Sequence, residues 1–213
     1  MVEIQKKLSL VNRTITTNRK KQWIVIHYVG AVSTAKNNVD YFYNVDRGAS
    51  AHYFVDEKEI WQCVDDSNIS WHCGAKKYYN DCRNQNSIGI EMCCKKDSKG
   101  NLYIPDKVIE NTIELTKMLM EKFGIDKNHV CRHYDVTKKN CPAPLVKDEE
   151  LWTNFKNKLE KSKEITDIKT ALDFLEKNGR VTNRLYWEKA LVTTRNVDYM
   201  FIKWANDLQN LLA

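Results

Sequence analysis

The stretch Trp23-Ile24-Val25-Ile26-His27 is a short, continuous apolar run that ends in a histidine. Its apolar residues are β-branched or aromatic, which is typical of a buried central strand in a sheet covered on both faces. A histidine at the end of such a strand is expected at the rim of the sheet, where ligands bind in α/β folds. The stretch therefore predicts the centre of the fold and one member of a site.

A second apolar run, Ser87-Ile-Gly-Ile-Glu-Met-Cys93, predicts another buried strand with a carboxylate in its middle. Burial of a carboxylate without a partner is costly, so Glu91 is expected either to form an ion pair or to serve a site. The run 52–55, the charged turn 56–58 and the run 60–64 predict a β-hairpin.

Amphipathic helices are expected between these strands. Ser33 or Thr34 can cap a helix that runs to about Val45, and a long helix is expected from Asp106 to about Phe123, where Gly124 suits the C-cap position. A further helix is expected over residues 148–161. Strands interleaved with helices predict an α/β fold.

The connecting segments are predicted to be irregular. Residues 1–20 are expected to lie along the surface, residues 69–74 to be short and extended, and residues 75–86 to form a loop. Residues 131–142 have neither a helix period nor a strand period and are also expected to be a loop.

The composition indicates a folded chain of 213 residues, because 42% of the residues are hydrophobic and there are only 7 Gly and 3 Pro. No apolar run approaches the ~20 residues that a membrane-spanning helix needs. The first 19 residues lack the apolar centre of a secretory signal, so we expect no signal peptide and synthesis into the cytoplasm.

The net charge and the cysteine pattern are weaker evidence, the first about the partner and the second about the cellular compartment. A formal net charge of +6 favours anionic partners, and both nucleic acid and the acidic bacterial wall fit that charge. The seven cysteines include no Cys-x-x-Cys pair, which argues against a structural zinc cluster. We expect reduced thiols in preference to three disulfides.

The C-terminal part of the chain has a different pattern. A Lys/Glu-rich stretch, 156–166, suggests a helical tail or a linker, and three short amphipathic helices follow. We therefore predict a domain over 1–160 and a small three-helix unit over 161–213, close to the lower size limit for independent folding. Its candidate contact aromatics are Tyr186, Trp187 and Trp204, although aromatics at helical spacing are more often core.

The segment Cys131-Arg-His-Tyr-Asp-Val-Thr-Lys-Lys-Asn-Cys-Pro142 carries two good zinc ligands, His133 and Cys141. His27 is the natural third ligand. Three protein ligands plus a water are the catalytic arrangement of zinc, and the pKa of such a water falls to about 7. The alternative is that all three are ordinary polar residues near a sheet edge.

Other residues are candidates for the chemistry around such a metal. Glu91 is the natural base for the water, unless it forms a buried ion pair, and Lys139 could stabilise an oxyanion, unless it is a solvated loop lysine. Weaker candidates for a substrate-binding groove are His52, Trp71 and His72. The chain has no Gly-x-Ser-x-Gly elbow and no phosphate-binding glycine loop.

Five ordered segments, 24–30, 50–55, 71–74, 87–91 and 132–142, resemble the zinc-dependent N-acetylmuramoyl-L-alanine amidases, a family that includes phage endolysins and the peptidoglycan recognition proteins. The resemblance covers about residues 20–160. It implies a mixed central sheet flanked by helices, and hydrolysis of the amide bond between N-acetylmuramic acid and L-alanine.

The resemblance also implies roles for single residues. The residues that match the zinc ligands are His27, His133 and Cys141, and those that match catalytic residues are Glu91 and Lys139. Where some members have a catalytic tyrosine in the hairpin strand, this chain has His52. Whether His52 assists the water, binds substrate or does neither stays open.

The expected setting follows from the same resemblance. We expect bacterial peptidoglycan as substrate, and a phage endolysin that stays in the host cytoplasm until a holin opens the membrane. The unit 161–213 is expected to bind a cell-wall polymer or to mediate a homodimer. Two alternatives are a peptidoglycan-binding module without turnover and a regulator that binds nucleic acid or a polymerase; nucleic acid is the less expected partner.

Overall fold

The computed structural model describes residues 3–160, 165–193 and 197–212. The chain divides into two compact units, Met1–Leu159 and Glu160–Ala213, and the predicted boundary lies one residue further on. Within the predicted linker, residues 161–164 lie outside the described residues.

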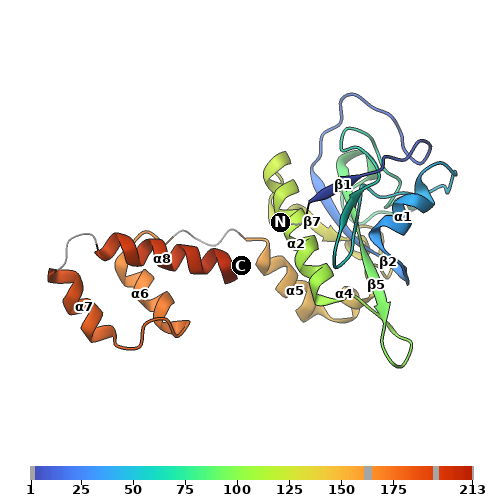
Figure 1. Ribbon diagram of the computed structural model, residues 1–213. Coiled ribbons are helices and arrows are strands. Elements are labelled where there is room, and N and C mark those ends of the chain that lie inside the picture. Colours follow the sequence, from blue (N-terminus) through green and yellow to red (C-terminus); the bar gives the residue numbers. More distant parts are fainter. Residues whose placement is uncertain (1–2, 161–164, 194–196, 213) are drawn as a thin grey trace. The chain divides into compact units, whose positions relative to one another are not determined.

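The first unit is built on a mixed β-sheet with the strand order β1-β4-β3-β5-β2-β7 (Figure 1). The strands are β1 (Ile4–Lys6), β2 (Trp23–Val32), β3 (Tyr53–Val55), β4 (Ile60–Gln62), β5 (Ser87–Lys96), β6 (Leu102–Tyr103) and β7 (Val130–Arg132). The central strand β2 runs parallel to both β5 and β7, and β5 runs parallel to β3. The hairpin partner β4 is antiparallel to β3, and β6 is antiparallel to β5.

Helices cover both faces of this sheet, as Figure 1 shows: α2, α4 and α5 lie on one side and α1 on the other. The helices are α1 (Ala35–Phe42), α2 (Asp106–Phe123), α3 (His133–Thr137), α4 (Ala143–Lys147) and α5 (Glu149–Lys158). The predicted caps are confirmed: Thr34 accepts the backbone N–H of Asn37, and Gly124 ends α2 at a φ of +66°. The predicted mixed sheet with flanking helices is confirmed.

The two faces of the central strands carry different residues. The face toward α2 and α5 is the main core, to which β2 and β5 contribute Ile24, Ile26, Ile88, Ile90 and Met92. Each such side chain contributes roughly 1.5–3 kcal/mol through removal from water. The intervening residues face the other way, and His27 and Glu91 are paired in register there. This alternation explains why a carboxylate interrupts the apolar run of β5.

The loop predicted over residues 131–142 is wrong. This segment contains the end of β7, all of α3, and a turn that leads into α4. Strand and helix are only three and five residues long, so neither completes enough periods to be recognised in the sequence.

Three further local predictions are wrong. His27 does not end its strand, because β2 continues to Val32, with an irregularity after Tyr28. Residues 4–6 are not a surface leader but form β1, which pairs in parallel with β4. The piece 69–74 is extended only at its start: Ile69 makes an isolated bridge to Thr14, and a bend follows at His72 and Cys73.

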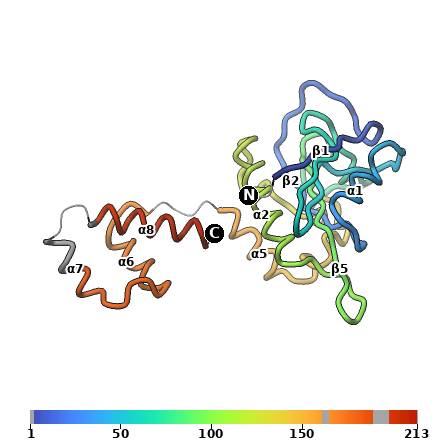
Figure 2. The backbone as a smooth tube through the Cα atoms, viewed as in Figure 1, coloured from blue at the N-terminus to red at the C-terminus, as the bar shows by residue number. Residues whose placement is uncertain are grey.

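The second unit contains the three predicted helices, α6 (Ile168–Lys177), α7 (Arg184–Thr193) and α8 (Val197–Leu212), whose course can be followed in Figure 2. Its core comprises Ile165, Ala171, Leu172, Leu175, Val181, Phe201, Ala205 and Leu208. Trp187 packs partly against this core, whereas Tyr186 and Trp204 are exposed. Among the described residues, no helix is long and apolar enough to cross a membrane.

Candidate metal centre

Three candidate ligands meet where the short strand β7 ends, beside the middle of the longer strand β2. His27, His133 and Cys141 are all buried, and their ligand atoms lie within 4.8 Å of one another. His27 Nδ1 lies 3.7 Å from Cys141 Sγ, and the centroids of the two imidazole rings are 4.7 Å apart. The cluster joins residues that are more than 100 positions apart in the chain.

The sheet brings two of the ligands to this point, His27 from within β2 and His133 directly after the end of β7. The last β2–β7 pair is Ile26 with Arg132, so the next residues of the two strands are His27 and His133, where β7 turns into α3. The buried Arg132 guanidinium fixes this corner by donating to Asp135 and to the backbone carbonyl of Leu145.

Cys141 reaches the cluster through a loop that returns to the start of α3. The backbone N–H of Tyr134 donates to the carbonyl of Cys141 at 2.9 Å, which closes the segment between them. The ligands at 133 and 141 are therefore held by one short closed unit, and the sheet holds the third ligand.

The electrostatics of the cluster suit a dication. Burial holds the pKa of His27 well below 6.5 and lowers that of His133 to about 4, so both rings are neutral near pH 7. Burial and the charge of Glu91 raise the pKa of the Cys141 thiol to about 12. Neutral imidazoles and a thiolate are the protonation states that bind zinc, and a bound dication stabilises the thiolate.

One ligand atom has no other use. Among the residues that the structure describes, His133 Nδ1 is buried and has no hydrogen-bond partner. An unpaired buried polar atom is costly. A metal would satisfy it, so the three residues fit a zinc ion with three protein ligands.

Glu91 lies beside the three ligands, opposite His27 in the β2–β5 register. Its Oε2 atom is enclosed and is bonded by none of the described residues, so the predicted alternative of a buried ion pair is not what this oxygen forms. Burial raises the pKa of Glu91 to about 8, and the charge of Lys139 opposes this rise. A carboxyl group that titrates near neutral pH is suited to proton transfer.

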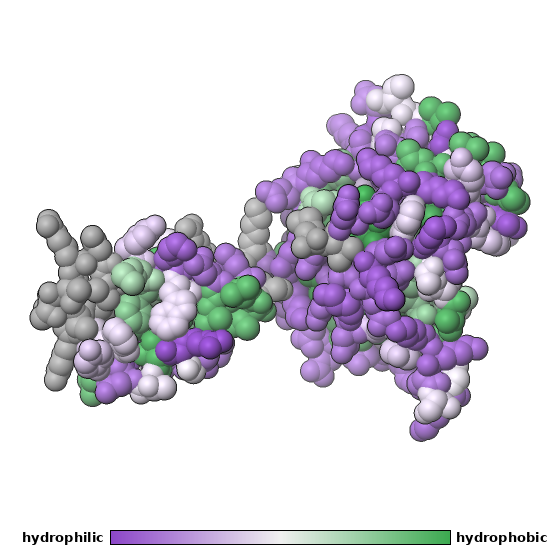
Figure 3. All heavy atoms as spheres, viewed as in Figure 1, coloured by the Kyte–Doolittle hydropathy of each residue, from purple (hydrophilic) through white to green (hydrophobic). Residues whose placement is uncertain are grey.

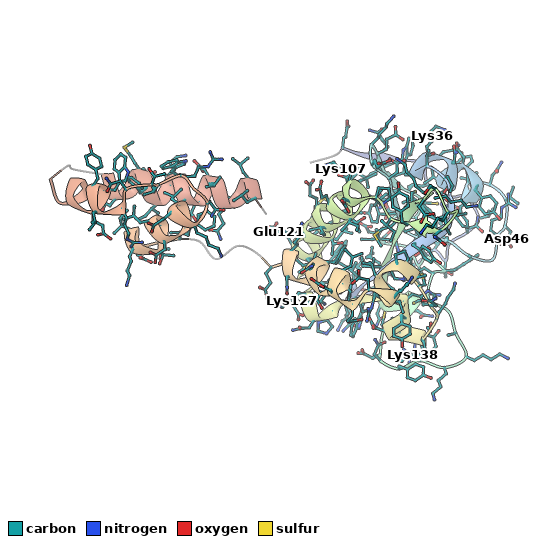
Figure 4. All side chains as sticks on the ribbon, turned by 90° about the horizontal axis from the view of Figure 1, so that it is seen from below. Lys36, Asp46, Lys107, Glu121, Lys127 and Lys138 are labelled. Carbon is teal, nitrogen blue, oxygen red and sulfur yellow. The ribbon has the colours of Figure 1, made fainter. Side chains whose placement is uncertain are left out.

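A cavity of about 670 Å³ opens next to the ligands. Trp71, His133 and Lys139 line it, together with Lys138, which Figure 4 labels and which is exposed. The Lys138 ammonium lies 4.8 Å from the ring centroid of Tyr134. Among the described residues that line this cavity, Lys138 and Lys139 are cationic and none is acidic, so its wall is positively charged.

Comparison with known proteins agrees with this geometry. The family model described as N-acetylmuramoyl-L-alanine amidase matches residues 17–144, which is more than half of the chain. The chain belongs to the N-acetylmuramoyl-L-alanine amidase family.

The amidase-family relatives include bacterial and phage-type proteins. The chain is 33% identical over 174 residues to the N-acetylmuramoyl-L-alanine amidase CwlL of Bacillus licheniformis, which covers 75% of this chain and 47% of that relative. Among solved structures it is similar to PlyL, with 27% identity and a TM-score of 0.65 over 75% of this chain and 98% of that one. It is also similar to a mutant endolysin from Bacillus subtilis, with 31% identity and a TM-score of 0.62 over 75% and 100% of the two chains. The chain spans about half the length, or less, of the curated relatives that it matches first.

In this amidase-family chain, two of the three predicted groove residues border the cavity. Trp71 lines the cavity, and its indole N–H donates to Thr14. His72 also borders the cavity, but its ring is packed behind His27, with its Nδ1 atom 3.0 Å from His27 Nε2. The substrate-binding role predicted for these two residues stays a prediction.

His52 does not line a groove. Its side chain is fully buried, the backbone N–H of Gly89 donates to its Nδ1, and its Nε2 lies 3.2 Å from the carbonyl of Asn68. Burial and the neighbouring charge of Arg19 hold its pKa well below 6.5. These contacts leave no ring nitrogen for a substrate. His52 lies next to β3, whose three residues are too few for the sequence pattern to show which side chains face the site.

The sequence did not identify Arg19 and Ser70 as neighbours of His52. The Arg19 guanidinium lies 3.0 Å from His52 Nε2 and donates to the carbonyl of Ser87, and Ser70 contacts His52 Nδ1 at 2.7 Å. Neither residue lies in an apolar run, and no spacing rule connects them to the metal ligands.

Proposed function

We propose that this protein is a zinc-dependent N-acetylmuramoyl-L-alanine amidase that hydrolyses the amide bond between N-acetylmuramic acid and L-alanine in bacterial peptidoglycan. The observation that carries the proposal is the buried cluster of His27, His133 and Cys141 beside Glu91, whose enclosed Oε2 atom has no hydrogen-bond partner among the described residues. Membership of the amidase family supports it.

Zinc held by these three residues would supply a Lewis acid that lowers the pKa of a water and polarises a carbonyl. The protein contributes a pocket that keeps both imidazoles neutral. It also places a proton acceptor, the carboxyl group of Glu91, next to the ligands. The zinc cofactor is thus supported by the donor set and by the unpaired His133 Nδ1 atom.

Glu91 and Lys139 divide the remaining work between them. Glu91 takes a proton from the attacking water, whose oxygen bonds to the carbonyl carbon of the lactyl group. Glu91 then delivers the proton to the leaving amine of L-alanine, so the amide C–N bond breaks and a lactyl carboxylate and a free amino terminus form. Lys139 borders the cavity, and its ammonium is the charge available to the developing oxyanion. The described residues that line the cavity include two lysines and no acidic residue, so the cavity can accommodate the carboxylates of the stem peptide.

The test is digestion of purified murein with and without a chelator, followed by mass spectrometry of the soluble products. We expect free stem peptides that begin with L-alanine, lost on chelation and restored by zinc. Murein that retains the protein but releases no new amino termini would favour the binding module without turnover. Zinc-independent, salt-sensitive binding of nucleic acid would favour the regulator.

We further propose that the second unit binds a cell-wall polymer. Large apolar and aromatic side chains of this unit are exposed, namely Leu185, Tyr186, Tyr199, Met200, Trp204, Leu211 and Leu212, and Figure 3 shows apolar side chains toward the C-terminal end of α8. Exposed aromatic rings can stack on sugar rings.

Sedimentation with murein of the whole protein and of its Trp204→Ala variant tests this role. We expect a several-fold loss of retention, with catalysis on soluble muropeptides unchanged. A loss of dimer in the variant, with retention on murein unchanged, would favour the homodimer.

An endolysin that waits in the host cytoplasm is the cellular setting we propose. The similarity to a protein described as an endolysin supports it, whereas the similarity to cell-wall amidases fits a bacterial autolysin equally. Expression in a susceptible bacterium distinguishes the two: we expect lysis only when a holin is co-expressed. Lysis without a holin would point to an exported autolysin.

A further inference from the structure

A chain of hydrogen bonds runs from the candidate metal ligand His27 into the protein. His27 Nε2 lies 3.0 Å from His72 Nδ1, His72 Nε2 lies 3.1 Å from Ser87 Oγ, and Ser87 Oγ lies 2.6 Å from the backbone carbonyl of Arg83. The two histidines and the serine are buried. His72 and Ser87, which form these hydrogen bonds, have no role in the proposed amidase mechanism.

The direction of each bond in this chain follows from its last member. A backbone carbonyl can only accept, so the Ser87 hydroxyl donates to Arg83. The Ser87 oxygen then accepts the Nε2–H of His72, and in the neutral tautomer that donates from Nε2 the other ring nitrogen, Nδ1, is an acceptor. His72 Nδ1 therefore accepts the Nε2–H of His27, and the bare nitrogen of a neutral His27 is Nδ1, the atom that faces Cys141.

We infer that His72 is a positioning residue for the metal: it fixes His27 in the tautomer whose Nδ1 atom is free to bind the ion. Metal-ligating histidines generally donate their other ring N–H to a carboxylate, a carbonyl or a water, and loss of that partner typically costs 10–100-fold in metal affinity. Here an imidazole anchored by Ser87 supplies the acceptor.

The backbone around His72 is built to hold this ring. The side-chain oxygen of Asn84 accepts the backbone N–H of both His72 and Cys73, at 3.1 and 2.9 Å, which fixes the turn that carries the histidine. On the other side the ring lies against Gly89, where an added Cβ atom would lie 2.6 Å from His72 Cγ. Gly89 is thus the residue of β5 that makes room for the acceptor ring.

This inference gives His72 a different role from substrate binding. A substrate-binding residue would change KM and leave the zinc affinity unchanged. A positioning residue changes the zinc affinity and the ligand geometry even without substrate. The inference rests on the proposed zinc site, and the measurements below separate the two.

The test compares the zinc dissociation constants of whole-protein variants by competition with a chromophoric chelator. We expect the zinc Kd of His72→Phe, which keeps the ring shape and loses the acceptor, to rise 10–100-fold. His72→Asn keeps an acceptor near the Nδ1 position and should stay within about threefold of the unaltered protein. Gly89→Ala should resemble His72→Phe, because the added methyl group displaces the ring.

The matched control is His129→Gln, which removes a partly exposed histidine that contacts Asp126. It should leave the zinc Kd unchanged. Cobalt substitution supplies a second readout, since the visible bands of the His72→Phe complex should lose the intensity typical of a tetrahedral site. A zinc Kd within twofold of the unaltered protein in a folded His72→Phe variant would overturn the inference. Failure of the unaltered protein to bind zinc would instead overturn the proposed function.

A measurement on the unaltered, zinc-free protein covers the case in which the phenylalanine variant does not fold. Long-range ¹⁵N–¹H correlation spectra report which nitrogen of each histidine carries the proton. We expect His27 and His72 both to carry it on Nε2. A proton on Nδ1 of His27 would refute the proposed direction of the hydrogen-bond chain.

Discussion

Alternate residues of the central strands β2 and β5 face two different environments. Toward α2 and α5, Ile26 and Ile90 are fully buried among other apolar side chains. Toward α3, His27 and Glu91 lie next to each other, and both titrate far from their ordinary range. The same strands thus provide hydrophobic stabilisation on one face and ionisable groups with strongly shifted pKa values on the other.

The difference teaches how this fold can hold costly groups. A buried carboxyl group without a partner destabilises the folded state, and only a well-packed core one residue away can offset that cost. Substitutions on the apolar face should therefore change stability and leave the chemistry intact. Substitutions on the site face should change the chemistry, and they should change stability only through the shifted pKa values of the groups they remove.

The largest effect is expected from Glu91→Ala on the site face. Loss of the proton acceptor should lower the release of amino termini from murein by about a thousandfold, because general acid–base catalysis contributes 10²–10⁴-fold, with zinc still bound. The measurement pairs turnover with zinc content, and Glu114→Gln, an exposed position on α2, is the control. Activity close to that of the unaltered protein would show that Glu91 is not the base.

The apolar face should respond in the opposite sense. Ile90→Ala removes a fully buried side chain and should lower the free energy of unfolding by about 3 kcal/mol, whereas Ile90→Val should cost about 1 kcal/mol. Urea denaturation gives these values, and chelator competition should give an unchanged zinc affinity. A large loss of zinc affinity in either folded variant would contradict the division between the faces.

An effect of similar size, but dependent on pH, should link the site face to stability. In the zinc-free protein the pKa of Glu91 is about 8 in the folded state, against an ordinary value of 4.5. Between these pH values the folded state keeps a proton that the unfolded chain releases, so the stability contributed by Glu91 falls as the pH rises from 4.5 to 8. Glu91→Gln removes this dependence. It should gain about 2–4 kcal/mol over the unaltered protein between pH 4 and pH 9, measured by urea denaturation. A difference that does not vary with pH would argue against a buried, protonated Glu91.

The smallest effect is expected at the edge of the cavity. Lys139→Met should lower kcat/KM for murein about tenfold, equivalent to about 1.4 kcal/mol of transition-state stabilisation, because an exposed ammonium is partly screened by water. Zinc affinity should stay the same or rise slightly, since a positive charge near the ligands is removed. Lys138→Met is the matched control, and an equal loss of kcat/KM in both variants would assign the effect to the general charge of the cavity.

Much of the metal centre could be predicted because its residues lie beside recognisable elements. The runs that contain His27 and Glu91 are long enough to identify as strands, and the caps of α1 and α2 are explicit in the sequence. The ligands His133 and Cys141 were predicted from residue type and from family resemblance, since the fold of their own segment was predicted wrongly.

The remaining features could not be predicted, for physical reasons that differ. Strand β1 is defined by its parallel partner β4, some 56 positions away, and its three residues carry no pattern of their own. His52 directly precedes the three-residue strand β3, and such a short strand does not show toward which face of the sheet the His52 side chain points. The role of His72 depends on a turn held by Asn84 and on the missing side chain of Gly89, and these relations exist only in the folded state.

All seven cysteines are free and buried, and they lie in different parts of the first unit. Cys94 belongs to the main core, Cys63 and Cys93 to the cluster under α1, and Cys73, Cys82 and Cys131 to the cluster beside α3. A thiol reagent can modify these residues only when the surrounding structure opens, so the rate at which each one is labelled reports the local opening free energy of its region. The chain thus contains its own set of labelling probes, and bound zinc would add protection at one of them, Cys141.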